Sequence, residues 1–212
     1  MTEKTGFFGG TFNPLHVGHL LAAMFIRERA GLEKVCIVPA GISPFKQGDP
    51  WMAPFEKRLH WAKQAFLGMD GFEVLDLERP VAGKPSFTAE TMRTFFRQRG
   101  FFPTLILGMD AFSEFHRWRE AGFLRRNCPL LVFSRKGLSP SKAPEHSLPE
   151  HSFVEIPRMD ISSSLVRGRI QEKKPIRGMV AESMSADVEE TYRAMFNREP
   201  DTASHRSGFG EK

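Results

Sequence analysis

The sequence has little cysteine and no long apolar run. Its 212 residues include two cysteines. Cys36 lies within an apolar segment and Cys128 lies just before another, which argues against a disulfide framework and fits a reducing cytoplasm. No apolar stretch is long enough to cross a bilayer, and the first four residues lead directly into a strand pattern. We therefore expect a cytoplasmic protein with no signal peptide and no membrane partner.

The chain also lacks a block of like charge. Its formal net charge is +5 and its pI is about 9.4, values that suit nucleic acid, membrane surfaces or small phosphorylated ligands. The basic residues are scattered, however, and there is no lysine-rich tail and no aromatic RNA-binding signature. We expect small anionic ligands and no nucleic acid. An RNA-binding module stays open on charge alone, and steep salt dependence of RNA binding would support it.

The order of apolar patterns predicts the fold. Strand and helix signals alternate, which indicates parallel βαβ units. Strands are predicted at residues 5–9, 34–39, 72–77, 104–107, 130–134 and 153–156. Helices are predicted at residues 17–30, 54–67, 87–100, 111–118, 120–126, 162–171 and 187–197. We predict an α/β fold, a doubly wound parallel sheet of Rossmann-like type. It forms a single domain over residues 1–197, with a loop at 136–150, a mobile tail at 198–212 and ligands at the carboxyl ends of the strands.

The common phosphate-binding motifs are absent, both the P-loop and the G-x-G-x-x-G fingerprint. In their place residues 9–20 read GGTFNPLHVGHL, at the junction of the first strand and the first helix. A helix start offers unpaired N–H groups and a positive dipole end, and glycines let a phosphate approach the backbone. His16 and His19 add donors that can carry positive charge, so this segment suits a triphosphate. A bare H-x-x-H pair can also be surface or cap chemistry.

A second anion-binding pattern lies at residues 161–167, which read ISSSLVR. Three hydroxyls at a helix start add donors beside unpaired N–H groups. Arg167 falls one turn after Ser163 and Ser164, so its guanidinium can face the same anion. The alternative is ordinary N-capping by serine with a surface arginine.

Together the two motifs resemble the HxGH…ISSSxxR combination of the nucleotidyltransferase superfamily. Four further segments resemble bacterial nicotinate-nucleotide adenylyltransferases: PSFTAET at residues 85–91, LGMD at 107–110 followed by Trp118, SPFK at 43–46, and VFSR at 132–135. The resemblance runs from about residue 7 to residue 169. It implies a Rossmann-like nucleotidyltransferase fold.

The resemblance also implies a reaction. The 5′-phosphate of nicotinate mononucleotide would attack the α-phosphorus of ATP, giving nicotinate adenine dinucleotide and pyrophosphate in NAD biosynthesis. No covalent enzyme intermediate is needed, so catalysis rests on positioning and charge stabilisation. Mg²⁺ is the expected cofactor, held by ATP and water rather than by protein ligands.

Site residues follow from the same resemblance. The catalytic and phosphate-binding set is His16, His19, Lys46 and Arg167, with His19 the first choice for stabilising the transition state. The ATP-binding set is Gly9, Gly10, Thr11, Phe12, Gly18, Gly108, Asp110, Arg135, Ser162, Ser163 and Ser164. The mononucleotide-binding set is Asn13, Ser86, Phe87, Thr88 and Trp118. Trp118 would stack on the pyridine ring, and the helix start at 86–88 would receive the carboxylate.

Several of these residues have a purely structural interpretation. Trp118 could be core packing, Thr88 a helix cap, Asp110 the cap of a helix that begins at Ala111, and Gly108 the end of a strand. These interpretations stay open in the sequence.

Two positions depart from the family pattern. Asn13 stands where the family usually has aspartate, and Phe45 where it usually has histidine, so an anionic role at position 13 and one phosphate donor are in doubt. We expect altered kinetics rather than an inactive enzyme. The alternatives are another HxGH enzyme, of the pantetheine-phosphate or nicotinamide-mononucleotide type, or a non-catalytic nucleotide-binding protein. Oligomeric state is left open.

Overall fold

Six parallel strands form the centre of the protein. The computed structural model describes residues 4–42, 49–81, 84–135 and 151–197. The sheet order is β3-β2-β1-β4-β5-β6, and every neighbouring pair is parallel. The strands are β1 (Thr5–Gly10), β2 (Lys34–Pro39), β3 (Phe72–Val74), β4 (Thr104–Gly108), β5 (Leu130–Arg135) and β6 (Ser152–Ile156). The strand order reverses between β1 and β4, so a crevice is expected at their carboxyl ends.

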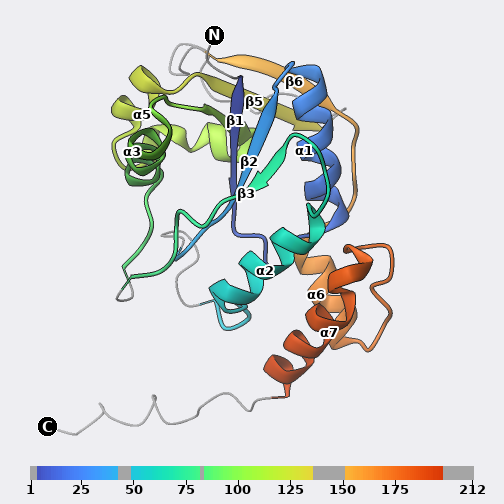
Figure 1. The fold of residues 1–212 in the computed structure, drawn as a ribbon. Coiled ribbons are helices and arrows are strands. Elements are labelled where there is room, and N and C mark those ends of the chain that lie inside the picture. The colour runs from blue at the N-terminus through green and yellow to red at the C-terminus, as the bar shows by residue number, and fades with distance from the viewer. Residues whose placement is uncertain (1–3, 43–48, 82–83, 136–150, 198–212) are drawn as a thin grey trace, which may run out of the picture.

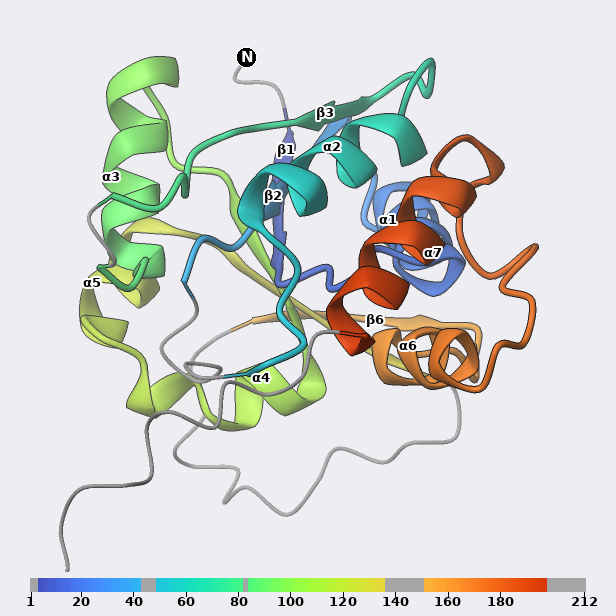
Figure 2. The same ribbon diagram turned by 90° about the horizontal axis from the view of Figure 1, so that it is seen from below.

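Helices cover both faces of this sheet. They are α1 (Val17–Arg29), α2 (Phe55–Ala65), α3 (Thr88–Arg99), α4 (Met109–Ser113), α5 (Ala121–Asn127), α6 (Ser163–Gln171) and α7 (Glu182–Phe196), with a 3₁₀ turn η2 (Phe115–Arg117). Figure 1 shows α3 and α5 on one side of the sheet and α1 on the other. α6 and α7 pack against each other and lie below α1 in Figure 1, and α7 also contacts α2; Figure 2 shows the same group from below. The predicted doubly wound parallel sheet is therefore confirmed.

The strands β1, β2, β4 and β5 contribute side chains to two separate cores, because successive side chains point to opposite faces of the sheet. Phe7, Leu105 and Leu107 pack with α3 and α5 in one cluster. Phe8 and Ile106 pack with α1, α2, α6 and α7 in the other. Strands buried on both faces are expected to be continuously apolar, which explains why these runs were easy to recognise in the sequence.

Some element boundaries differ from the sequence predictions. β3 ends at Val74 rather than at residue 77. Leu75 still donates its N–H to the carbonyl of Ile37, but the reciprocal donor would be the nitrogen of Pro39, which has no N–H. The ladder of this edge strand therefore stops.

Two helices were also placed wrongly. α7 begins at Glu182 rather than at residue 187, because its first turns carry polar residues around the single buried Met184 and so show no clear periodicity. The helix predicted over 111–118 is two pieces, α4 and η2. The 136–150 loop and the 198–212 tail lie outside the described residues. Across the described part of the chain, no helix is long and apolar enough to cross a membrane.

Candidate functional site

A cavity of about 500 Å³ opens at the carboxyl ends of β1 and β4. Three segments that the sequence assigned to the site line it together. They are Gly9, Gly10 and Thr11 at the end of β1, Gly108 at the end of β4, and Ser86, Phe87 and Thr88 at the start of α3. Trp118 also lines it. This is the crevice expected where the strand order reverses, and its volume falls in the ~300–1,000 Å³ range of small-ligand sites.

The turn after β1 brings the two histidines together. His16 is the N-cap of α1 and is buried, with 3% of its surface exposed. Its backbone N–H donates to Nδ1 of His19 at 3.3 Å, and the two rings stack at 3.8 Å between centroids. Phe12, in the left-handed region at φ 49°, packs edge-on against His19 at 5.0 Å. Because Nδ1 of His19 accepts a hydrogen bond, its proton resides on Nε2, which is the donor that a phosphate oxygen requires.

The second motif docks onto this same turn. Ser163 Oγ donates to the carbonyl of Pro14 at 2.9 Å. Arg167 donates to the carbonyl of Asn13 at 2.7 Å and to Ser164 Oγ at 3.4 Å. The structure therefore brings the two motifs into contact, although 149 to 154 positions separate the contacting residues in sequence.

Gly18 and Ser162 serve the structure of this junction. A Cβ on Gly18 would lie 2.6 Å from Cγ2 of Ile161, so only glycine lets the segment before α6 approach α1 this closely. Ser162 is the N-cap of α6, and its Oγ accepts the N–H of Leu165 at 3.1 Å. The interpretation of Ser162 as a helix cap is therefore confirmed. Contacts of Ser162 and Gly18 with ATP stay predictions.

The side chain of Asn13 makes three hydrogen bonds within the protein. Its side-chain amide, 4% exposed, donates to the carbonyl of Trp51 and accepts from the N–H of Ala53, both at 2.9 Å. The hydroxyl of Tyr192 donates to the same oxygen at 2.6 Å. The amide therefore joins the β1–α1 turn to two other segments, and a contact with the mononucleotide stays a prediction.

The start of α3 forms the wall opposite the β1 turn. Phe87 is its N-cap residue, and no side chain caps the helix, so the interpretation of Thr88 as a cap is wrong. The reason is position: Thr88 is already the first helical residue, while a capping side chain must belong to the residue before it. Ser86, Phe87 and Thr88 at this helix start line the cavity, and the first N–H groups of a helix have no partner within the helix, as an anion-binding wall requires.

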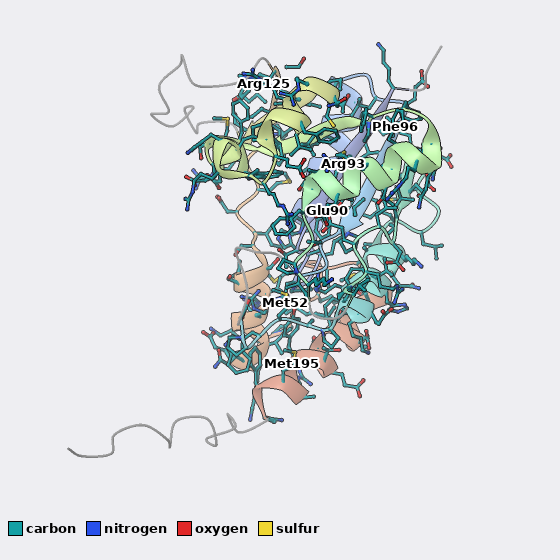
Figure 3. All side chains as sticks on the ribbon, turned by 90° about the vertical axis from the view of Figure 1, so that its left-hand side faces the viewer. Met52, Glu90, Arg93, Phe96, Arg125 and Met195 are labelled. Atoms are coloured by element: carbon teal, nitrogen blue, oxygen red, sulfur yellow. The ribbon has the colours of Figure 1, made fainter. Side chains whose placement is uncertain are left out.

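Trp118 is partly buried, and ion pairs hold its segment against α3. Its ring lies 5.6 Å from that of Phe115, so it contacts both the cavity and the core. Arg119 pairs with Glu90 at 3.7 Å, and Glu120 pairs with Arg93 at 2.5 Å. Figure 3 shows Glu90 and Arg93 with Phe96 along the outer face of α3. These pairs link the tryptophan to the helix whose start forms the opposite wall.

Three charged residues that line the cavity were missed by sequence reasoning. Arg117 and Arg119 line the cavity on either side of Trp118, and the guanidinium of Arg119 lies 4.4 Å above the Phe87 ring. In the sequence they belong to the scattered basic residues. Their positions directly beside Trp118, the proposed stacking residue, were the signal that could have placed them in the site. Glu78 also lines the cavity, and no local motif marks it.

The remaining predicted residues lie as follows. Asp110 is in the first turn of α4, which begins at Met109, so it does not cap a helix that starts at Ala111, and that interpretation is wrong. It is exposed, and its contact with a ribose stays a prediction. Gly108 both ends β4 and lines the cavity. Arg135 is the last residue of β5. Lys46 and its loop at 43–48 lie outside the described residues.

Comparison with known proteins agrees with this geometry. The cytidylyltransferase-like family model matches residues 7–169. A probable nicotinate-nucleotide adenylyltransferase of Thermotoga petrophila is 34% identical over 200 residues, covering 91% of this chain and 98% of that protein. A protein of the same name from Roseiflexus sp. is 38% identical over 189 residues, covering 87% and 94%.

A solved structure shares the fold at lower identity. The Plasmodium falciparum nicotinic acid mononucleotide adenylyltransferase complexed with NaAD superimposes with a TM-score of 0.72 at 16% identity, over 92% of this chain and 98% of that chain. The family model and the two bacterial relatives span most of the sequence. This chain therefore belongs to the nicotinate-nucleotide adenylyltransferases, enzymes of the cytidylyltransferase-like nucleotidyltransferase family.

Proposed function

We propose that the protein transfers the adenylyl group of ATP to nicotinate mononucleotide, a step of NAD biosynthesis. An oxygen of the 5′-phosphate of the mononucleotide forms a bond to the α-phosphorus. The bond from that phosphorus to the bridging oxygen breaks, and pyrophosphate leaves with the electron pair. The observation that carries the proposal is the contact of the two anion-binding motifs, through Arg167 and Ser163, beside a cavity at the β1–β4 crevice.

ATP is assigned to the β1 turn and the α6 start. Donors from His16, His19, Ser164 and Arg167 lie near the turn that follows the two glycines at the end of β1. Ser163 holds the start of α6 to this turn through its hydrogen bond to the carbonyl of Pro14. Fixed donors of this kind stabilise charge that builds up on phosphate oxygens as the bond breaks, without reorganising at that moment. Charge on the leaving pyrophosphate is neutralised most directly by Arg167, whose planar guanidinium matches the geometry of phosphate oxygens.

Magnesium enters this proposal with the nucleotide. Among the described residues, no three histidine, cysteine, aspartate or glutamate side chains gather as a metal site. Mg²⁺ keeps several waters and binds readily to phosphate oxygens through few protein ligands, which fits MgATP as the substrate. When bound, Mg²⁺ would neutralise negative charge on the phosphates, in addition to the charge neutralised by the side chains.

The pyridine end of the mononucleotide is assigned to the opposite wall. Trp118 offers a ring for stacking, and the start of α3 at Phe87 and Thr88 offers N–H donors to a carboxylate. Arg117 and Arg119 add positive charge to the same cavity. This combination favours nicotinate over nicotinamide, because an amide NH₂ carries no negative charge and finds no acceptor among N–H groups.

The described cysteines fit a reducing compartment. Cys36 and Cys128 are both buried, and burial raises the pKa of the Cys128 thiol to about 12. A cytoplasmic site of action is consistent with unreactive thiols of this kind.

Pyrophosphate release from ATP and Mg²⁺ tests the function. Nicotinate mononucleotide and nicotinamide mononucleotide are assayed side by side, with phosphopantetheine as a third acceptor. We expect the acid mononucleotide to react fastest. Equal rates for acid and amide would keep the reaction but contradict the assignment of the carboxylate to α3. Turnover of phosphopantetheine alone would replace the proposed acceptor.

A further inference from the structure

Glu78 is a cavity-lining carboxylate that no part of the proposed reaction uses. It lies in the segment between β3 and α3, and both of its oxygens accept hydrogen bonds. Oε2 accepts from Ser86 Oγ at 2.6 Å and from the N–H of Gly41 at 3.4 Å. Oε1 accepts from Thr91 Oγ1 at 2.9 Å. One side chain therefore joins the segment after β2 to the first turns of α3.

Arg58 also binds the segment after β2, through hydrogen bonds to backbone carbonyl oxygens. It belongs to α2 and is 2% exposed, and a guanidinium keeps its proton even when buried. It donates to the backbone carbonyl oxygens of Ala53 at 3.0 Å, Thr11 at 2.8 Å, Ala40 at 2.6 Å and Gly41 at 2.9 Å. A buried charge needs such compensation, and here main-chain carbonyls from three segments supply it.

Gly41 is held between these two opposite charges. Its N–H donates to Glu78 and its carbonyl accepts from Arg58. A Cβ at this position would lie 2.1 Å from the backbone oxygen of Glu78, so the close approach requires glycine. The next residue, Ile42, accepts the backbone N–H of Ser86 at 3.0 Å.

These contacts form a continuous connection across the cavity. It runs from Thr11 through Arg58 to Gly41, and then through Glu78 to Ser86. Thr11 is on the wall assigned to ATP, and Ser86 is on the wall assigned to the mononucleotide. The connection therefore sets how far apart the two walls lie.

We propose that Glu78 and Arg58 are positioning residues that fix the separation of the two substrates, so that the attacking phosphate meets the α-phosphorus. The inference rests on the proposed function and deepens it. Neither residue is assigned a contact with a reacting atom. A shift of about 1 Å between reactants can cost on the order of 100-fold in rate, while each half-site still binds its own substrate.

Glu78→Ala is the direct test. It removes all three hydrogen bonds of the carboxylate, and we expect kcat to fall on the order of 100-fold. The dissociation constants of ATP alone and of nicotinate mononucleotide alone, from calorimetry, should change less than about 3-fold. A parallel loss of kcat and of both affinities would show a merely structural role and overturn the proposal, as would wild-type turnover.

Milder variants keep the test decisive if Glu78→Ala does not fold. Glu78→Gln retains the shape and an acceptor for Gly41, while Arg58→Lys retains charge but cannot span four carbonyls. We expect the kcat of Glu78→Gln to be close to that of the unaltered enzyme. Arg58→Met removes the guanidinium altogether and should lower kcat, and we expect Arg58→Lys to restore little of that loss. If lysine restored kcat fully, charge alone would suffice and the proposal would fail for Arg58.

Two controls separate this inference from the proposed function. Glu172→Ala removes an exposed carboxylate that pairs with Lys174 at 2.7 Å, and it should leave kcat unchanged. The unaltered enzyme is assayed first with nicotinate mononucleotide. Absence of turnover there would contradict the proposed function, whereas normal turnover in both the enzyme and Glu78→Ala would contradict the positioning role alone.

Discussion

The hydroxyl of Tyr192 donates a hydrogen bond to Oδ1 of Asn13 across 179 positions of sequence. Tyr192 lies in α7 and is fully buried, while Asn13 lies in the turn that carries the two histidines. Burial raises the pKa of the Tyr192 hydroxyl, so the hydroxyl keeps its proton and donates it. Its partner must therefore be an acceptor oxygen. The amide of Asn13 presents such an oxygen and turns its NH₂ toward the carbonyl of Trp51.

This arrangement predicts the effect of Asn13→Asp, which restores the usual family residue. The second carboxylate oxygen would face the carbonyl of Trp51, so we expect the free energy of unfolding to fall by about 1–3 kcal/mol, measured by urea denaturation. The Mg²⁺ concentration for half-maximal rate should not change. Tyr192→Phe is the matched control, with a loss of about 1 kcal/mol. A strong shift in Mg²⁺ dependence would show instead that position 13 helps to hold the metal.

His19→Ala tests the assigned transition-state role. Removing a donor that strengthens as the bond breaks should lower kcat on the order of 100- to 1,000-fold, with a much smaller change in the affinity for ATP. His60→Ala on α2, an exposed histidine, serves as the control and should react normally. Equal losses in ATP affinity and in kcat would refute the role.

Trp118→Ala tests the stacking assignment. We expect the KM for nicotinate mononucleotide to rise on the order of 10-fold or more, since stacking of a base on an aromatic ring contributes about 1–3 kcal/mol, with little change in the KM for ATP. Trp118→Phe should retain most of the affinity. Circular dichroism decides the alternative: if the alanine variant unfolds, the contact with Phe115 and the core dominates.

Asp187 predicts how stability depends on pH. Burial alone would raise its pKa, but hydrogen bonds from Lys57 at 2.5 Å and Trp61 at 2.7 Å outweigh burial and lower the pKa below 3.8. The carboxylate therefore stabilises the fold above the unfolded-state pKa, and this contribution is lost as pH falls through the folded-state pKa.

Asp187→Asn should accordingly be less stable than the unaltered protein at pH 7, by about 1 kcal/mol or less for a partly exposed pair. The difference should shrink below about pH 4 and vanish at lower pH, as measured by denaturation at a series of pH values. Asp160→Asn, at an exposed pair with Arg158, is the control. A difference that is constant with pH would mean that packing, not charge, is lost.

The parts of the fold that could be predicted from the sequence are those determined by residues close together in the chain. After Lys34 the segment VCIVP is continuously apolar because β2 is buried on both faces, and the predicted bounds of the strand are confirmed. Gly100 ends α3 in the left-handed conformation at φ 81°, as a glycine after a helix suggests. The two anion-binding motifs were also local, so their residues could be named before their contact was known.

The residues that sequence reasoning missed have distant partners. Arg58 reads as an ordinary charge on a helix, because the carbonyls that compensate it belong to residues 5 to 47 positions away. Glu78 follows no pattern, since its partners come from the segment after β2 and from α3. The burial of Asn13 depends on Trp51, Ala53 and Tyr192. No local propensity encodes such contacts.

The contact of Arg167 with the carbonyl of Asn13, 154 positions apart, has a consequence during synthesis of the chain. The turn that carries the histidines leaves the ribosome well before α6, the helix that adds Ser164 and Arg167 to its donors. A chain that stops before residue 161 would contain all six strands but only half of the phosphate-binding groups. Formation of long-range contacts is slow relative to local ones, so the complete set of phosphate-binding groups forms only after Arg167 has been synthesised.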